Sequence, residues 1–110
     1  MRILTAAELK MKLDRGDTFK LVMALDRYAF AKKHIPGSLH FDTYEDMAAA
    51  LSPDEEVVVY CSNPKCPASM QAYYYLESKG FRRLYRFAGG LAAWEQAGHA
   101  LAGSMAPSPV

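Results

Sequence analysis

The sequence is short of the residues that mark several common classes of function. Among its 110 residues there are only two cysteines, and the three histidines (His34, His40 and His99) are too dispersed for the ligand spacing of a zinc site. The formal net charge is +1, and the charges are scattered along the chain. Proteins that bind nucleic acid usually carry a basic patch or run. We therefore expect neither a metal site nor a nucleic-acid partner.

Long apolar runs are also missing. No stretch is long enough to span a bilayer, and the first residues, Met1 to Thr5, lack the apolar segment of a signal peptide. We therefore expect a cytoplasmic location without membrane contact. In that compartment, two cysteines are more often reactive, redox-active or simply buried than joined in a structural disulfide.

What is present suits a single folded domain. Hydrophobic residues make up 51% of the chain, which is enough to fill one core of this size. The last stretch, residues 103–110, lacks any periodicity, which is typical of a loose chain end. We expect one domain at 1–102 and a flexible tail at 103–110.

Strand-like and helix-like segments alternate along the chain. Apolar and β-branched stretches predict strands at 2–4, 19–24, 39–41, 57–60 and 84–87. Capping signals and apolar spacing predict helices at 6–14, 26–33, 42–51, 68–79 and 91–97. Two capping boxes, Thr5 to Glu8 and Asp42 to Glu45, are expected to open the first and third helices. This alternation predicts an α/β fold with an open, mainly parallel sheet of about five strands and helices on both faces.

The buried strand at 57–60 ends in Cys61, which makes this cysteine the strongest candidate for chemistry. Ligands of open α/β sheets bind outside the carboxyl ends of the strands. The helix predicted from Ala68 directs its free N–H groups and its positive dipole end toward the loop. That environment favours a thiolate, so Cys61 is a candidate nucleophile. The alternative is a small buried hydrophobe at a strand end.

The loop between this strand and the next helix holds a second cysteine and several polar residues. For Cys66 three readings stay open: an inert residue near the helix start, a resolving thiol that pairs with Cys61, or a second sulfur carrier. Lys65 is either a solvated side chain or a cation that attracts an anionic donor. Ser62 and Asn63 either donate to a bound anion or satisfy the turn. Pro64 and Pro67 give the loop its shape, and their stiffness either preorganises an anion site or has no function beyond the turn.

Four segments, in order, resemble the single-domain rhodanese-like sulfurtransferases. They are Phe30 with His34-Ile35-Pro36-Gly37-Ser38, then Val57-Val58-Val59-Tyr60-Cys61, then Gly80-Phe81, and last Gly89-Gly90-Leu91-Ala92-Ala93-Trp94 with Ala97-Gly98. The resemblance covers about residues 2–101. It implies a catalytic Cys61 that accepts a sulfane sulfur as a persulfide and passes it on, with the loop amides of 62–67 holding the negative charge. It implies no cofactor.

The sequence departs from the family pattern in three places. The Asp-Val-Arg stretch that usually ends the second strand is replaced by Met23-Ala24-Leu25, so the loop must be held by other contacts. The loop is longer than usual and carries Lys65 where an Arg fork would suit an oxyanion better. The second cysteine, Cys66, is the third departure.

The resemblance predicts a sulfurtransferase or sulfur carrier. Its partners would be a small donor, thiosulfate or a persulfide, and a thiol acceptor that is either a small molecule or a protein. Two alternatives stay open: a dithiol redox protein that cycles a Cys61–Cys66 disulfide, and a non-catalytic module that presents the loop to a partner. No feature of the sequence predicts an oligomeric state.

Overall fold

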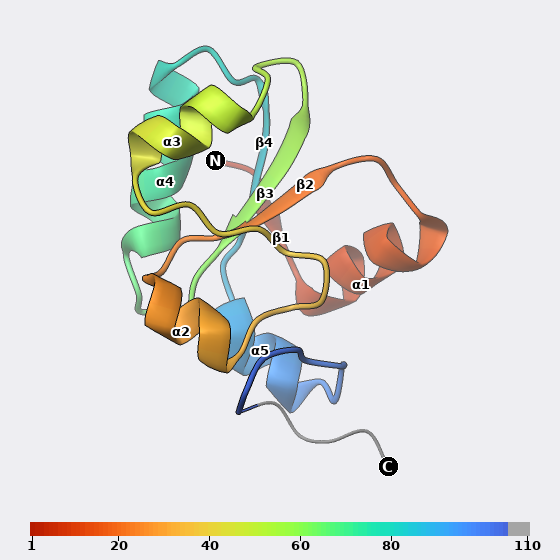
Figure 1. The fold of residues 1–110 in the computed structure, drawn as a ribbon. Helices are drawn as coiled ribbons and strands as arrows, with labels where there is room; N and C mark the ends of the chain where they lie inside the picture. The colour runs from red at the N-terminus through yellow and green to blue at the C-terminus, as the bar shows by residue number, and fades with distance from the viewer. Residues whose placement is uncertain (106–110) are drawn as a thin grey trace.

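The structure, a computed structural model, describes residues 1–105 and contains a four-stranded sheet (Figure 1). The strands run in the order β1-β4-β3-β2, and every neighbouring pair is parallel. Their bounds are β1 (Ile3–Leu4), β2 (Lys20–Met23), β3 (Glu56–Tyr60) and β4 (Arg83–Phe87). Strand β3 is therefore central, and this is the strand that leads to Cys61.

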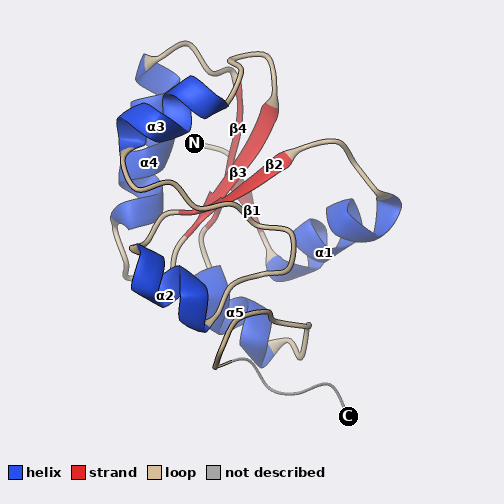
Figure 2. Ribbon diagram, viewed as in Figure 1, coloured by secondary structure: helices blue, strands red, loops and turns tan. Residues whose placement is uncertain are grey.

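Helices cover both faces of the sheet (Figure 2). Their bounds are α1 (Ala6–Arg15), α2 (Arg27–Lys32), α3 (Tyr44–Ala50), α4 (Ala68–Ser78) and α5 (Gly90–Gln96). Residues of α1 and α5 pack on one face of the sheet, and residues of α3 and α4 pack on the other. The predicted α/β fold with a parallel sheet and two helical layers is confirmed, and each predicted helix lies within one or two residues of its place.

The strand predicted at 39–41 is reduced to a single bridge. Leu39 pairs with Val22 in the parallel sense, at the open edge of β2. Its N–H donates to the Leu21 carbonyl at 2.7 Å, and its carbonyl accepts from the Met23 N–H at 2.9 Å. The chain turns away immediately afterwards, so the fifth strand position is occupied by one residue.

The helix starts show one correct and one shifted prediction. Thr5 and Glu8 form the predicted capping box at the start of α1. At α3 the cap is Thr43, whose side chain accepts from the Asp46 N–H, so the prediction that Asp42 opens the box was wrong by one residue. Thr43 also has a side-chain acceptor suited to that role, and spacing alone did not decide between the two.

The core has two halves, one on each face of β3. Side chains of Val58 and Tyr60 belong to the cluster beneath α1 and α5, and those of Val57 and Val59 to the cluster beneath α3 and α4. All four are 0% exposed. Full burial of such side chains contributes about 1.5–3 kcal/mol each. The strand before Cys61 is therefore a rigid base for whatever that residue does.

The described chain ends in a segment that contacts α2. The predicted flexible tail, 103–110, lies beyond 105 for the most part, outside the described residues. Ser104 and Met105 donate their N–H groups to the carbonyls of Ala31 and Lys32 in α2. None of the helices within residues 1–105 is both long enough and apolar enough to cross a bilayer.

Candidate functional site

Cys61 lies where the sequence placed it, directly after the last residue of β3. Tyr60 pairs with Met23 of β2 on one side and Phe87 of β4 on the other, so the following residue emerges at the middle of the sheet's carboxyl edge. Cys61 is only 1% exposed. The loop of residues 62–67 then leads into α4.

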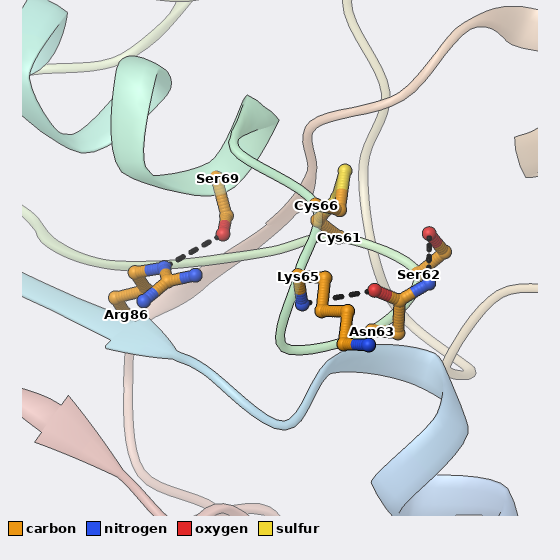
Figure 3. Close-up of a disulfide and its surroundings, with 7 residues drawn as sticks. All are labelled: Cys61, Ser62, Asn63, Lys65, Cys66, Ser69 and Arg86. Carbon is orange, nitrogen blue, oxygen red and sulfur yellow. Dashed lines mark hydrogen bonds between the residues drawn. A yellow bond between two sulfur atoms is a disulfide. The ribbon is translucent and has the colours of Figure 1, made fainter.

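The second cysteine is bonded to the first. The Sγ atoms of Cys61 and Cys66 form a disulfide across five positions, with the Cα atoms 6.3 Å apart (Figure 3). That Cα separation is within the range that a disulfide bridge requires. Cys66 is partly exposed, whereas Cys61 is buried. The structure thus brings together the candidate nucleophile and the candidate resolving thiol.

Asn63 gives the loop its shape. Its side-chain Oδ1 accepts from the Lys65 N–H at 2.9 Å, and its carbonyl accepts from the Cys66 N–H at 3.2 Å. Such a side-chain contact to the backbone two residues on is a common way for Asn to hold a turn. Pro64 lies inside the turn, and Pro67 occupies the N-cap position of α4. The loop therefore has a conformation fixed by its own hydrogen bonds as well as by the disulfide.

These bonds change which amides are free to hold an anion. The family resemblance implies that the loop amides of 62–67 have that role. Pro64 and Pro67 have no N–H, and the amides of Lys65 and Cys66 already donate to Asn63. Among the backbone N–H groups of residues 62–70, those of Ser62, Asn63 and the first turn of α4 are left without an acceptor in the described chain.

The start of α5 anchors the other side of the loop. The N–H of Leu91 donates to the Cys61 carbonyl at 2.9 Å, and the N–H of Ala92 donates to the Ser62 carbonyl at 2.8 Å. Gly90 makes this approach possible: it has φ of +64°, and a Cβ there would lie 2.6 Å from the Cys61 carbonyl oxygen. The sequence marks Gly89-Gly90 only as part of the family resemblance, and it does not reveal this contact.

The segments around Met23 and Leu25, where the family pattern has an Asp and an Arg, are held by other contacts in this chain. The buried Tyr60 hydroxyl accepts from the Ile35 N–H at 3.0 Å and lies 2.8 Å from Ser38 Oγ. Burial raises the pKa of Tyr60, against the opposing effect of these two hydrogen bonds. The Leu25 carbonyl lies 2.6 Å from His40 Nε2. The turn at 34–38 is thereby tied to the strand that leads to Cys61, and the segment after β2 is tied to His40.

Two cations lie near the loop, and only one was expected. Lys65 is exposed, as a solvated side chain would be. Arg86 reaches from β4 toward the first turn of α4, where its Nε donates to Ser69 Oγ at 2.8 Å (Figure 3). None of the ion pairs within residues 1–105 includes Lys65 or Arg86. The alternation of β4 could have indicated Arg86. Leu84, two residues earlier, is buried against α3 and α4, and residues two apart in a strand lie on the same face.

A cavity of about 510 Å³ lies beside the start of α4. Its walls come from the end of β2, the start of α2, the segment 41–44 and α3, and they are largely apolar. Two carboxylates, Asp26 and Asp42, are among its lining residues, and Asp42 is paired with Arg27 at 2.9 Å. Neither cysteine lines this cavity in the disulfide form. Across residues 1–105, no group of three or more His, Cys, Asp or Glu side chains is placed to hold a metal ion.

Comparisons with known proteins agree on the fold. The family described as the rhodanese-like domain matches residues 5–97. The BH2092 protein from Bacillus halodurans superposes with a TM-score of 0.87 at 23% identity, covering 96% of this chain and 79% of that one. The rhodanese-like domain of the Alr3790 protein from Anabaena sp. gives 0.83 at 26% identity, covering 100% and 87%. A rhodanese-like domain protein from Staphylococcus aureus gives 0.76 at 21%, covering 100% of both chains. A search of curated proteins finds no match.

Proposed function

This chain belongs to the rhodanese-like domain family, and we propose that it transfers sulfane sulfur through a persulfide on Cys61. The observation that supports this most directly is the position of Cys61 at the carboxyl end of the central strand, ahead of the N-terminus of α4. Such a position suits an activated thiolate. The reduced protein, with both thiols free, is the form that begins the cycle.

In the first step, the Cys61 thiolate attacks the outer sulfur of the donor. With thiosulfate, the new bond joins Cys61 Sγ to that sulfur, the original sulfur–sulfur bond breaks, and sulfite leaves with the electron pair. With a low-molecular-weight persulfide, the leaving group is the thiolate of the donor. In the second step, an acceptor thiolate attacks the outer sulfur of the Cys61 persulfide and releases the Cys61 thiolate.

The persulfide carries a negative charge that the site must stabilise. The free amides of Ser62, Asn63 and the first turn of α4 are oriented donors, and they cost no reorganisation when the charge forms. Arg86 adds a positive charge at the same end of α4, through its contact with Ser69. A charge in this place partly compensates for the Arg that the loop itself lacks.

The cavity beside the start of α4 supports a choice between the possible sulfur donors. Its largely apolar walls and the two carboxylates among its lining residues suit the organic part of an alkyl persulfide better than the dianion of thiosulfate. We therefore expect a low-molecular-weight or protein persulfide to be the better donor, with a thiol as acceptor.

A second candidate function is favoured by one specific observation, the Cys61–Cys66 disulfide. A protein that only exchanges this disulfide with partner thiols would need both cysteines for every turnover. Sulfur transfer, in contrast, needs only Cys61.

Two variants therefore separate the candidates. We would measure thiocyanate formed from cyanide with thiosulfate or glutathione persulfide as donor, using wild-type protein, Cys61→Ser and Cys66→Ser, all reduced and desalted. Sulfur transfer predicts that Cys61→Ser is inactive at unchanged thermal stability of the reduced protein, while Cys66→Ser is active. Activity in Cys61→Ser, or inactivity of both wild-type protein and Cys66→Ser, would refute the proposal.

A further inference from the structure

We propose that Cys66 resolves the Cys61 persulfide, so that the protein also reduces sulfane sulfur to hydrosulfide. This inference rests on the proposed function, because it needs a persulfide on Cys61. The sulfur bound to Cys61 then has two possible fates. It is transferred to an acceptor thiol, or it is released as hydrosulfide while the Cys61–Cys66 disulfide closes.

The first argument is that the loop brings the two thiols to bonding distance. The Cys61 and Cys66 Sγ atoms are bonded, and no other described cysteine competes for either of them. Hydrogen bonds outside the disulfide hold both parts of the loop: Leu91 and Ala92 hold the Cys61 side, and Asn63 holds the Cys66 side. Because these bonds do not depend on the sulfur–sulfur bond, we expect Cys66 to stay near Cys61 in the reduced protein.

The chemical step balances without any further reagent. The Cys66 sulfur attacks the inner sulfur of the persulfide, which is Sγ of Cys61. The bond between the two Sγ atoms forms, and the bond from Cys61 Sγ to the outer sulfur breaks. The outer sulfur leaves with the electron pair and takes the proton from the Cys66 thiol as hydrosulfide. The two cysteine sulfurs are oxidised to the disulfide, and the sulfane sulfur is reduced.

The second argument is the unequal exposure of the two sulfur-bearing residues. Cys61 is 1% exposed, whereas Cys66 is partly exposed. A dithiol reductant therefore meets Cys66 first, forms a mixed disulfide there and releases Cys61 as the thiolate. The second thiol of the reductant then frees Cys66, and the reductant leaves as its own disulfide. The buried nucleophile is restored for the next donor.

The disulfide also protects the site between cycles. While the bond is closed, Cys61 has no free thiolate, so no second sulfur is accepted. Supply of a dithiol reductant thus sets the balance between the two outcomes, since each hydrosulfide released consumes two electrons.

The test is a single turnover without oxygen. Reduced and desalted wild-type protein, Cys66→Ser and Cys61→Ser are each mixed with one equivalent of glutathione persulfide. Hydrosulfide is measured over time, and intact-mass spectra report added sulfur or the loss of two hydrogens. We expect wild-type protein to release about one hydrosulfide per chain and to close the Cys61–Cys66 disulfide. We expect Cys66→Ser to hold the added sulfur and to release hydrosulfide at least about tenfold more slowly, because the attacking thiol is no longer intramolecular.

The outcomes are distinguishable. If Cys66→Ser gains a sulfur while wild-type protein keeps its persulfide and releases hydrosulfide no faster, this inference is wrong and the proposed sulfur transfer stands. If neither protein gains a sulfur or releases hydrosulfide, the proposed function itself fails, and the inference with it. Hydrosulfide release from Cys61→Ser at the wild-type rate would also overturn the inference, because it would not need the Cys61 persulfide.

Discussion

Replacing Gly90 by alanine tests how the loop that carries Cys61 is held. A Cβ at this position would lie 2.6 Å from the Cys61 carbonyl oxygen and 2.9 Å from the Asn63 backbone nitrogen. Real Cβ atoms do not approach backbone atoms so closely, so either the loop or the start of α5 must move. Gly98→Ala is a matched control, because Gly98 also has positive φ (+80°) but has no atom within 4 Å of its Cβ position.

The expected cost follows from these contacts. A non-glycine residue in the left-handed region costs about 1–2 kcal/mol, and both variants pay this cost. Movement at Gly90 also weakens the hydrogen bonds from Leu91 and Ala92 to the loop, each with a net contribution of about 0.5–1.5 kcal/mol. We therefore expect Gly90→Ala to lower the free energy of unfolding by about 2–5 kcal/mol, and Gly98→Ala by about 1–2 kcal/mol.

The same movement displaces the nucleophile. A misplacement of about 1 Å at a reacting group can cost on the order of a hundredfold in rate. Urea denaturation would measure the stability, and single-turnover sulfur uptake from glutathione persulfide would measure the rate. We expect uptake to fall roughly ten- to a hundredfold in Gly90→Ala and to stay at the wild-type rate in Gly98→Ala. Equal stability losses and equal uptake rates in the two variants would refute the reasoning.

Two further predictions concern the contacts around the loop. Arg86→Gln should slow sulfur uptake from thiosulfate several-fold more than uptake from glutathione persulfide. Arg86→Lys should restore part of the loss, because it keeps the positive charge. An equal effect on both donors would contradict a role for the charge. Tyr60→Phe should lower the free energy of unfolding by about 1–3 kcal/mol, because the Ile35 N–H and Ser38 Oγ lose a buried partner. Since burial raises the pKa of Tyr60 from its usual 10.0, its contribution is complete below about pH 10 and is lost as the pH rises through the raised value. Denaturation at pH 8 and at pH 11 should therefore show a smaller alkaline loss for Tyr60→Phe than for wild-type protein.

The sequence predicts the fold well because the strongest signals are local. The apolar run of β3, the alternation of strands with helices and the capping box of Thr5 and Glu8 each depend on residues that are close in sequence. The bridge at Leu39 shows where prediction from local signals fails. Its pairing depends on how far the chain follows the edge of β2, and the apolar pattern of 39–41 does not specify this.

The positions of the two candidate cysteines could be predicted from the sequence, whereas their contacts could not. Cys61 and Cys66 could be named from their place in the loop, whereas their bonding depends on the turn that Asn63 makes. The alternation of β4 indicates the face on which Arg86 lies, but its partner Ser69 is far away in sequence, as Cys61 is from Gly90, so pattern alone cannot reveal these two contacts. In the sequence, Arg86 is a charged residue at a core-facing strand position, and Gly90 is the second of two glycines. Only the folded chain shows which residues they contact.

The most direct test of the central claim uses the reduced Cys66→Ser variant, in which Cys61 is the sole thiol. Its intact mass would be recorded after incubation with glutathione persulfide or thiosulfate, and again after cyanide. The account predicts that at least the persulfide adds one sulfur atom, located at Cys61 by peptide mapping and removed by cyanide as thiocyanate. A variant that stays folded and gains no sulfur from either donor would contradict the account.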